Sequence, residues 1–339
     1  MPSWRGILSC FLAPQSFHLQ PTELAVHHAF AIPDLALIYS PEFLGHDTGS
    51  FHPENAGRLS ATLEALKTAT WANHLDWREP TPLDQRDVDS WIKRLHNPRY
   101  VEAVQHIAAE GGGNIDGDTV VSPRSYDVAR LAVSAWLDGV DYVLTSHHSA
   151  FVLSRPPGHH AVRDRGMGFC LFSNAAIAAH YALEQPGVGR VAIRDWDVHH
   201  GNGTQALVED HPSIAYCSLH QFPAYPGTGR ETETGLHHNV LNVPMPPGST
   251  SDDYHQSFKQ QVIPFLQDFG PDLLIVSAGY DANKADPLAS INLNPSDYGG
   301  FTHACMAVTP NILFGLEGGY DHEALSQSVL ATIQARLEA

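Results

Sequence analysis

From residue 34 onward, short apolar runs alternate with longer amphipathic stretches. The runs, rich in β-branched residues, predict strands at 35–39, 150–154, 190–194, 213–218, 240–243, 272–277 and 311–316. The amphipathic stretches predict helices at 55–70, 125–145, 174–184, 251–269 and 297–308, with a closing helix at 322–339. Strands that alternate with helices are typical of a parallel sheet with crossover helices. Because no repeat and no long linker divides this pattern, we predict a single α/β domain over residues 34–339.

Polar clusters begin where four of the predicted strands end. They read RPPGHH at 155–160, DWDVHHGNG at 195–203, AGYD at 278–281 with DPL at 286–288, and EGGY at 317–320. The carboxyl ends of parallel strands share one edge of a sheet, and ligand sites form in the crevice there. We therefore expect all four clusters to meet at one site.

Composition and charge narrow the class of protein. The chain has 339 residues, of which 43% are hydrophobic and 17% charged, and its formal net charge is −18. This balance excludes an intrinsically disordered chain and argues against direct binding to nucleic acid. The sequence contains no run of about 20 apolar residues that would span a membrane.

The cysteines and the first residues bear on location. Cys10, Cys170, Cys217 and Cys305 are widely spaced and contain no C-x-x-C pair, which favours a reducing compartment and a cytoplasmic protein. Residues 1–33 form an extension of uncertain role, which we interpret as either a loose leader or a weak transit peptide. An organelle-targeted form therefore remains an alternative.

Asp197 and His199 form a candidate metal-binding pair. Because they lie two residues apart in a segment that leaves a strand, an extended backbone points both side chains to the same side. Asp286 can supply a third ligand from a neighbouring strand end. Three protein ligands leave a fourth position for water, as in catalytic zinc sites. Alone, the D-x-H pattern also suits helix caps or ion pairs, but the neighbouring clusters favour zinc.

His159 and His160 have the chemistry that such a metal site lacks. Imidazoles serve as general acids and bases near neutral pH, and each usually has its second nitrogen held by a partner. Asp195 and Asn202 are available for that purpose nearby in the sequence. Tyr320 follows two glycines, which allow its phenol to approach the metal and to donate a hydrogen bond to an oxyanion. The alternatives are a structural histidine pair and a packed aromatic ring.

Two aromatic residues lie in loops flanked by glycine or proline. Phe169 follows Gly168, and Tyr225 precedes a Pro-Gly pair. Together they predict the walls of a slot for an alkyl chain, although core packing would explain either residue alone.

These motifs resemble those of the zinc-dependent histone deacetylase superfamily, which includes bacterial deacetylase-like and acetylpolyamine amidohydrolases. The resemblance covers the chain from about residue 35 to its end. Asn202 in HHGNGTQ is similar to the class II branch, since aspartate is usual there in class I. The matching segments are HPENAGRL at 52–59, RPPGHHA at 155–161, GFCLFSNAAIAA at 168–179, DWDVHHGNGTQ at 195–205, YPGTG at 225–229, NVPMPPGS at 242–249, SAGYDANKADPLA at 277–289 and LEGGYD at 316–321.

The resemblance implies a fold, a zinc centre and catalytic roles. The fold is a single arginase/deacetylase domain with a mostly parallel central sheet flanked by helices. One Zn²⁺ per chain is held by Asp197, His199 and Asp286. The tandem catalytic histidines are His159, with Asp195 behind it, and His160, with Asn202 behind it, and the transition-state tyrosine is Tyr320.

The resemblance also implies roles around the acyl tunnel and for a second cation. Phe169 and Tyr225 match the tunnel walls, Leu293 a hydrophobic rim position, and Arg58 the arginine beneath the tunnel floor. Asp118, beside Asp116, lies in the region where the family places a rim aspartate. A monovalent cation, K⁺, is implied at the carbonyls of Asp195, Asp197, His199 and Leu219 and the hydroxyl of Ser218.

The sequence therefore predicts a hydrolase that removes an acetyl group from an N-acetylated amine, as a monomer or an oligomer. Leu288 stands where polyamine-selective class II relatives can carry a glutamate, which favours acetyl-lysine or a small acetylamide over acetylpolyamine. A dimanganese ureohydrolase is disfavoured, because it needs an acidic ligand where this chain has Gly201. A catalytically silent module that binds acetylated ligands is the rival from another class.

Overall fold

The computed structural model describes residues 35–338, so the predicted extension over residues 1–33 lies outside the described residues. The centre of the fold is an eight-stranded sheet in the order β2-β1-β5-β10-β9-β6-β7-β8, and every neighbouring pair is parallel. The predicted α/β fold with a mostly parallel sheet is confirmed. The strands are β1 (Leu35–Ile38), β2 (Leu75–Arg78), β5 (Ser149–Val152), β6 (Val191–Asp195), β7 (Ile214–Gln221), β8 (Val240–Met245), β9 (Leu273–Ala278) and β10 (Ile312–Leu316).

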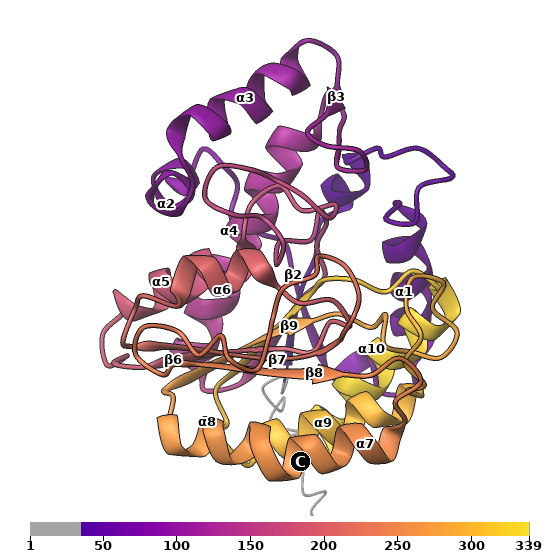
Figure 1. Cartoon of the computed structure of the whole chain (residues 1–339). Helices are drawn as coiled ribbons and strands as arrows, with labels where there is room; N and C mark the ends of the chain where they lie inside the picture. The colour runs from indigo at the N-terminus through magenta and orange to yellow at the C-terminus, as the bar shows by residue number, and fades with distance from the viewer. Residues whose placement is uncertain (1–34, 339) are drawn as a thin grey trace, which may run out of the picture. The chain divides into compact units, whose positions relative to one another are not determined.

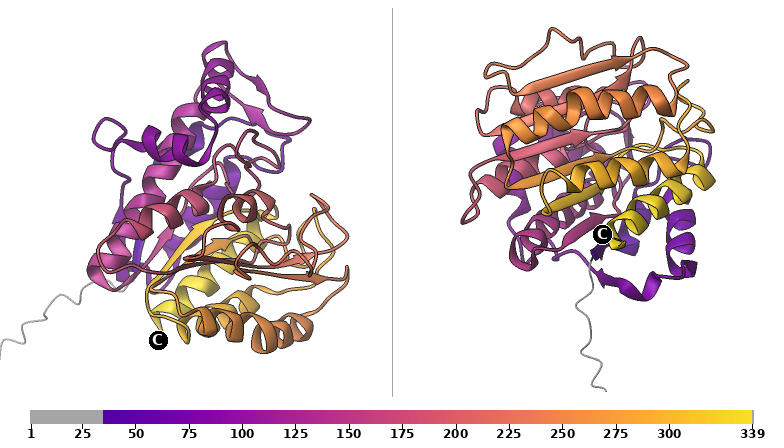
Figure 2. Two further views of the ribbon diagram at one scale, coloured as in Figure 1. Left: turned by 60° about the vertical axis from the view of Figure 1, so that its left-hand side comes forward. Right: turned by 90° about the horizontal axis from the view of Figure 1, so that it is seen from below.

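Helices cover both faces of this sheet (Figures 1 and 2). One face is covered by α7 (Ser251–Ser257), α8 (Ile263–Phe269) and α9 (Pro295–Met306), and α9 packs against α10 (His322–Leu337). The other face is covered by α4 (Ser125–Ser146), α5 (Asn174–Leu183) and α6 (Asn202–Val208). Beyond α4 lie α2 (Val88–Leu95) and α3 (Pro98–Ala109), whereas α1 (Gly57–Thr68) packs on α10.

The central strands are buried on both faces, as a parallel sheet covered by helices requires. All residues of β1, β5, β6, β7, β9 and β10 are buried. The close approach of α4 to β10 depends on a glycine, since a Cβ at Gly315 of β10 would lie 2.0 Å from the Trp136 ring of α4. This packing fixes the carboxyl ends of the central strands, from which the site is built.

Several elements differ from the sequence-based expectation. The sequence reading omitted β2, whose residues LDWR bury only Leu75 fully and therefore lack a β-branched apolar run. It also omitted α2, α3, α6 and the short hairpin of β3 (Gly113–Asn114) and β4 (Val120–Val121). The helix expected at 251–269 contains a π-helical turn at Phe258–Val262 between α7 and α8. Short 3-10 turns occur at Pro41–Gly45 and Ala72–His74.

Within residues 35–338, none of the helices is both long and apolar enough to cross a membrane. The three cysteines in this part of the chain, Cys170, Cys217 and Cys305, are buried thiols without a disulfide bond.

Candidate active site

Four loops at the carboxyl ends of neighbouring strands form the candidate active site. In the sheet β5, β10, β9 and β6 are adjacent in that order, and the four polar clusters follow these strands. Hydrogen bonds join the loops directly. The Gly158 amide donates to Oε2 of Glu317 at 2.6 Å, and the Gly318 amide donates to Oδ2 of Asp197 at 2.8 Å. The prediction that the clusters meet at one edge of the sheet is therefore confirmed.

His159 and His160 lie side by side, each with a different partner behind it. Their ring centroids are 4.0 Å apart. Nδ1 of His159 lies 3.1 Å from Oδ2 of Asp195, the last residue of β6. Nδ1 of His160 lies 2.8 Å from Oδ1 of Asn202, the first residue of α6. An amide oxygen only accepts, so Nδ1 of His160 donates and its Nε2 carries the free lone pair.

The surroundings shift the pKa values of the two imidazoles in opposite directions. Burial lowers the pKa of His159, but the carboxylates of Asp197 and Asp195 outweigh burial and raise it well above the ordinary value. Burial and the neighbouring His159 and His199 lower the pKa of His160 well below the ordinary value. Adjacent groups whose pKa values are pushed apart in this way suit different proton-transfer roles.

Asp197, His199 and Asp281 form a buried cluster with the donor set of a metal site. One ligand atom of each lies within 4.8 Å of the others. Nδ1 of His199 lies 3.2 Å from Oδ1 of Asp197 and 3.0 Å from Oδ2 of Asp281. Burial lowers the pKa of His199, but its hydrogen bonds to these carboxylates raise the pKa to about 10.

Asp286, the third ligand expected from the sequence, lies close to this cluster. Its Oδ2 accepts a hydrogen bond from the Tyr320 amide at 2.6 Å, and its Oδ1 accepts one from Leu288 at 3.0 Å. Burial raises the pKa of Asp286 to about 6, and the Asp197 charge contributes to this shift. Asp281 was not expected as a ligand from the sequence, although it lies in the AGYD segment that follows a predicted strand.

Two glycines let the backbone close around Asp197. A Cβ at Gly279 would lie 2.1 Å from Oδ2 of Asp197, and a Cβ at Gly318 would lie 2.5 Å from the same atom. Real Cβ atoms do not approach so closely, so the carboxylate would have to move. Glycine at these positions therefore leaves the space that the Asp197 carboxylate occupies.

A pocket of about 220 Å³ opens above the histidines. The Phe169 and Tyr320 rings meet edge to face at 5.7 Å, and Tyr225 meets the His160 ring at 5.0 Å. The lining residues are Asp118, His160, Gly168, Phe169, His199, Tyr225, Leu288 and Tyr320. The structure thus places both aromatic walls, Tyr320 and the expected rim residues Asp118 and Leu288 around one cavity.

Leu293 requires a correction. The resemblance implies a rim position, whereas the structure buries Leu293 fully and outside the pocket lining. Its amide donates to the carbonyl of Ala282, and its own carbonyl accepts from Lys284, so the chain is drawn against the 282–284 segment. Leu288, which is 41% exposed, is the leucine at the pocket mouth.

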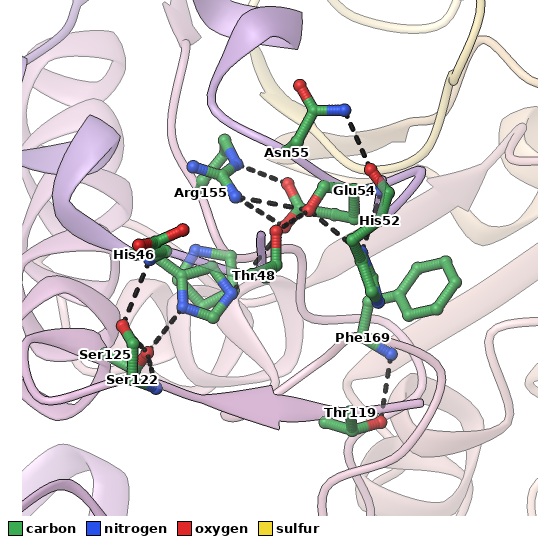
Figure 3. A network of polar contacts seen from close by, with 12 residues as sticks. His46, Thr48, His52, Glu54, Asn55, Thr119, Ser122, Ser125, Arg155 and Phe169 are labelled. Carbon is green, nitrogen blue, oxygen red and sulfur yellow. Dashed lines mark hydrogen bonds and ion pairs between the residues drawn. The ribbon is translucent and has the colours of Figure 1, made fainter. Parts of the chain in front are cut away.

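A buried charge network connects the 52–58 segment with the pocket wall (Figure 3). The Glu54 carboxylate pairs with Arg155 and, at 3.0 Å, with Arg58. Burial raises the pKa of Glu54, but Arg155 and Arg58 hold it well below its usual range. In the same network, His52 packs edge to face on the Phe169 ring at 4.7 Å.

Arg58, which the resemblance implies beneath the tunnel floor, contacts the segment that carries Tyr320. Its Nε donates to the carbonyl of Gly319 at 2.6 Å, and its guanidinium lies 5.2 Å from the centre of the Tyr320 ring. The sequence reading gave no role to Glu54 or Arg155, or to Tyr216 and Glu317, which bond to Asp195 and to the His159 amide. Glu54, Arg155 and Glu317 lie within the HPENAGRL, RPPGHHA and LEGGYD segments, but these motifs do not show which distant groups the residues contact.

The residues of the expected monovalent-cation site lie at the end of β6, in the loop after it and in the second half of β7. Asp195 is paired with Ser218 in the ladder between these strands. Asp195, Asp197, Ser218 and Leu219 are fully buried, and His199 is 9% exposed. The carbonyl of Asp195 accepts a hydrogen bond from the Arg194 guanidinium, a contact that the motifs do not indicate.

Comparisons with known proteins agree with this geometry. The family model described as "Histone deacetylase domain" matches residues 52–336. A Synechocystis protein described as uncharacterized, slr0245, is 56% identical over 89% of this chain and 99% of its own length. The histone deacetylase-like amidohydrolase of Pseudomonas aeruginosa is 35% identical over 91% of this chain and 81% of its own.

A solved structure shows the same fold. The crystal structure of the HDA15 HD domain superposes with a TM-score of 0.84 at 34% sequence identity, covering 90% of this chain and 89% of that domain. Sequence match, fold and strand-end motifs all agree. The chain belongs to the histone deacetylase family of deacetylases and amidohydrolases.

Proposed function

We propose that this chain is a zinc-dependent deacetylase that hydrolyses the amide bond of an N-acetylated amine. One observation carries the proposal. His160, held through Nδ1 by Asn202, lines the same aromatic-walled pocket as His199 and Tyr320. A proton-transfer group, a candidate metal ligand and an oxyanion donor thus surround a single cavity.

The residues present fit zinc. Asp197, His199 and Asp286 offer two carboxylates and one imidazole, a donor set used by catalytic zinc sites. Asp281 is fully buried, and its Oδ1 accepts a hydrogen bond from the Val198 amide at 2.8 Å. We therefore propose that Asp281 positions the loop that carries His199. When bound, zinc would polarise the acyl carbonyl and lower the pKa of water.

His160 is the proposed proton acceptor. Its Nδ1 is occupied by Asn202, and its lowered pKa keeps Nε2 unprotonated and able to take a proton from the attacking water. The same atom then gives the proton to the departing amine. His159, with its raised pKa and its Asp195 partner, holds positive charge beside it.

Tyr320 is the proposed oxyanion donor. Burial raises the pKa of its phenol well above the ordinary value, so the hydroxyl keeps its proton near neutral pH. A donor placed in advance and shielded from water stabilises developing negative charge better than water does. The edge-to-face contact with Phe169 fixes the Tyr320 ring at the pocket wall.

The pocket favours a substrate with a slender, uncharged chain that ends in the acetylated nitrogen. Phe169 and Tyr225 provide its aromatic walls, while Leu288 occupies the mouth. No carboxylate stands at position 288 to select a polyamine cation. We therefore propose acetyl-lysine or a small acetylamide as the substrate class, with acetylpolyamine as the alternative.

The test is acetate release from a matched panel of acetyl-lysine peptide, acetylpolyamine and a small aryl-ethyl acetamide by the zinc-reconstituted chain. We expect release from the peptide or the acetamide, with loss in Asp286→Ala and no change in Asp252→Ala, an exposed aspartate of α7. Absence of release from all three by the zinc-loaded protein would contradict the proposal and favour a binding module.

A further inference from the structure

Arg194 introduces a permanent positive charge beside the catalytic centre. It lies on β6 next to Asp195 and is fully buried. Its Nη1 donates to the backbone carbonyls of Asp195 and of Cys217, the latter at 3.2 Å. Because Arg194 is paired with Cys217 in the ladder, the guanidinium lies at the junction of β6 and β7.

The rest of the guanidinium has few partners. Within residues 35–338, Nε and Nη2 of Arg194 have no hydrogen-bond partner, and Arg194 forms no ion pair. Its guanidinium lies over the ring of Phe258, 4.6 Å from the ring centre, where the π-helical turn begins. A buried charge without an ion-pair partner is costly, so an arginine here needs a compensating electrostatic role.

Buried carboxyl groups near Arg194 provide a reason for its positive charge. Asp195, Asp197, Asp281 and Glu317 are carboxyl groups with no exposed surface at this edge of the sheet, and Asp286 is 7% exposed. Such a concentration of acidic groups favours additional positive charge nearby. Arginine provides it at every physiological pH, since its guanidinium does not lose its proton.

The position of Arg194 conflicts with the monovalent cation implied by the resemblance. That cation would bind the Asp195 carbonyl and Ser218 Oγ, and Arg194 already donates to the first of these. Ser218 Oγ lies 2.9 Å from Nδ1 of His220, whose Nε2 contacts the carbonyl of Gly229 at 2.9 Å. Nε2 therefore donates, Nδ1 accepts the serine proton, and the Ser218 lone pairs stay open. What distinguishes this place from a cation site is the Arg194 guanidinium at the Asp195 carbonyl.

We propose that Arg194 replaces the monovalent cation and makes the fold and the activity independent of K⁺. A K⁺ ion at the Asp195 carbonyl would lie beside a fixed charge of the same sign, and repulsion in a buried setting is strong. The activity part of this inference rests on the proposed function. The stability and ion-binding parts do not.

The experiment compares the zinc-loaded chain in KCl and in choline chloride at equal ionic strength. We expect the same Tm and the same acetate-release rate in both salts. Arg194→Met removes the charge and keeps a linear side chain. We expect this variant to lose roughly tenfold in rate in choline chloride and to recover in KCl, with a parallel rise in Tm. The matched control is Arg190→Met, an exposed arginine just before β6, which should gain no K⁺ dependence.

Crystals soaked in thallium(I), a K⁺ mimic, provide a test without an activity readout. We expect no anomalous peak at the Asp195 carbonyl and Ser218 Oγ of the wild-type protein. A peak there, or a wild-type Tm that rises with K⁺, overturns the proposal even if Arg194→Met fails to fold. A failure of acetate release alone, with the Tm and thallium results as expected, contradicts the proposed function and not this inference.

Discussion

Nδ1 of His160 lies 2.8 Å from Oδ1 of Asn202, so a neutral acceptor stands behind the imidazole at the pocket. Asn202→Asp would place a carboxylate there and raise the pKa of His160. Since the proposed base must be unprotonated, we expect the acidic limb of the kcat/KM profile to shift to higher pH. Profiles of wild type, Asn202→Asp and the exposed control Asn292→Asp measure this, and identical limbs would exclude His160 as the base.

Tyr320→Phe removes the phenol hydroxyl and keeps the ring against Phe169 and Arg58. We expect kcat to fall by about 10²–10³-fold, the usual loss when one oxyanion donor is removed, with little change in Tm. Steady-state kinetics together with thermal melts separate the two effects. Full activity in Tyr320→Phe would show that the hydroxyl does not contact the transition state.

The proposed zinc site uses Asp286, and not Asp281, as its third protein ligand. If Asp286 is the ligand, Asp286→Ala loses stoichiometric zinc at micromolar protein concentration. Asp281→Ala then keeps zinc with affinity weakened by about 10–100-fold, as expected for a residue that supports a ligand. Competition with a chromogenic chelator gives both values. The reverse order would assign the metal to Asp197, His199 and Asp281, the trio that lies within 4.8 Å.

Glu54 is the carboxylate that pairs with two buried arginines, Arg155 and Arg58. Glu54→Gln leaves their charges uncompensated, so we expect a loss of about 3–5 kcal/mol in the free energy of unfolding. Asp76→Asn breaks the exposed ion pair with Arg78 and should change stability by less than about 0.5 kcal/mol. Urea titrations of both variants measure the contrast, and equal losses would refute the assigned role of Glu54.

His96 makes stability depend on pH. Ser173 donates its amide to Nε2 at 2.9 Å, so Nδ1 carries the proton and donates to the Val162 carbonyl at 3.0 Å. Burial and Arg163 lower the pKa of His96 to about 4. The unfolded chain therefore binds a proton first, and stability present above pH ~6.5 falls as pH drops toward ~4, by roughly 3 kcal/mol.

Unfolding free energies between pH 7 and pH 4 test this dependence. His96→Gln should flatten the curve, while exposed His74→Gln should leave its slope unchanged. His46, whose pKa burial also lowers to about 4, accounts for a remaining slope in His96→Gln. An unaltered slope in His96→Gln would rule out the proton linkage.

Motifs that are contiguous in sequence predicted much of this molecule. The strand-end clusters brought His159, Asp195 and Asp197 to one edge, because parallel strands leave few other arrangements. The rim position expected for Leu293 was wrong because backbone hydrogen bonds to the 282–284 segment turn this residue inward. Residue spacing does not reveal such a turn. Arg194 interrupts an apolar strand, and only the paired strand β7 shows which carbonyls its charge meets.

The mouth and the floor of the pocket are made by different parts of the chain. Asp118, Tyr225 and Leu288 shape the entrance, whereas His159 and Asp197 are held by the sheet edge and its loops. Under the proposed function, substitutions at the mouth would therefore change which acylated amines fit, while the groups held by the sheet edge keep their positions. Divergence of substrate preference among proteins with this scaffold would then accumulate in its surface loops, at little cost to folding or to chemistry.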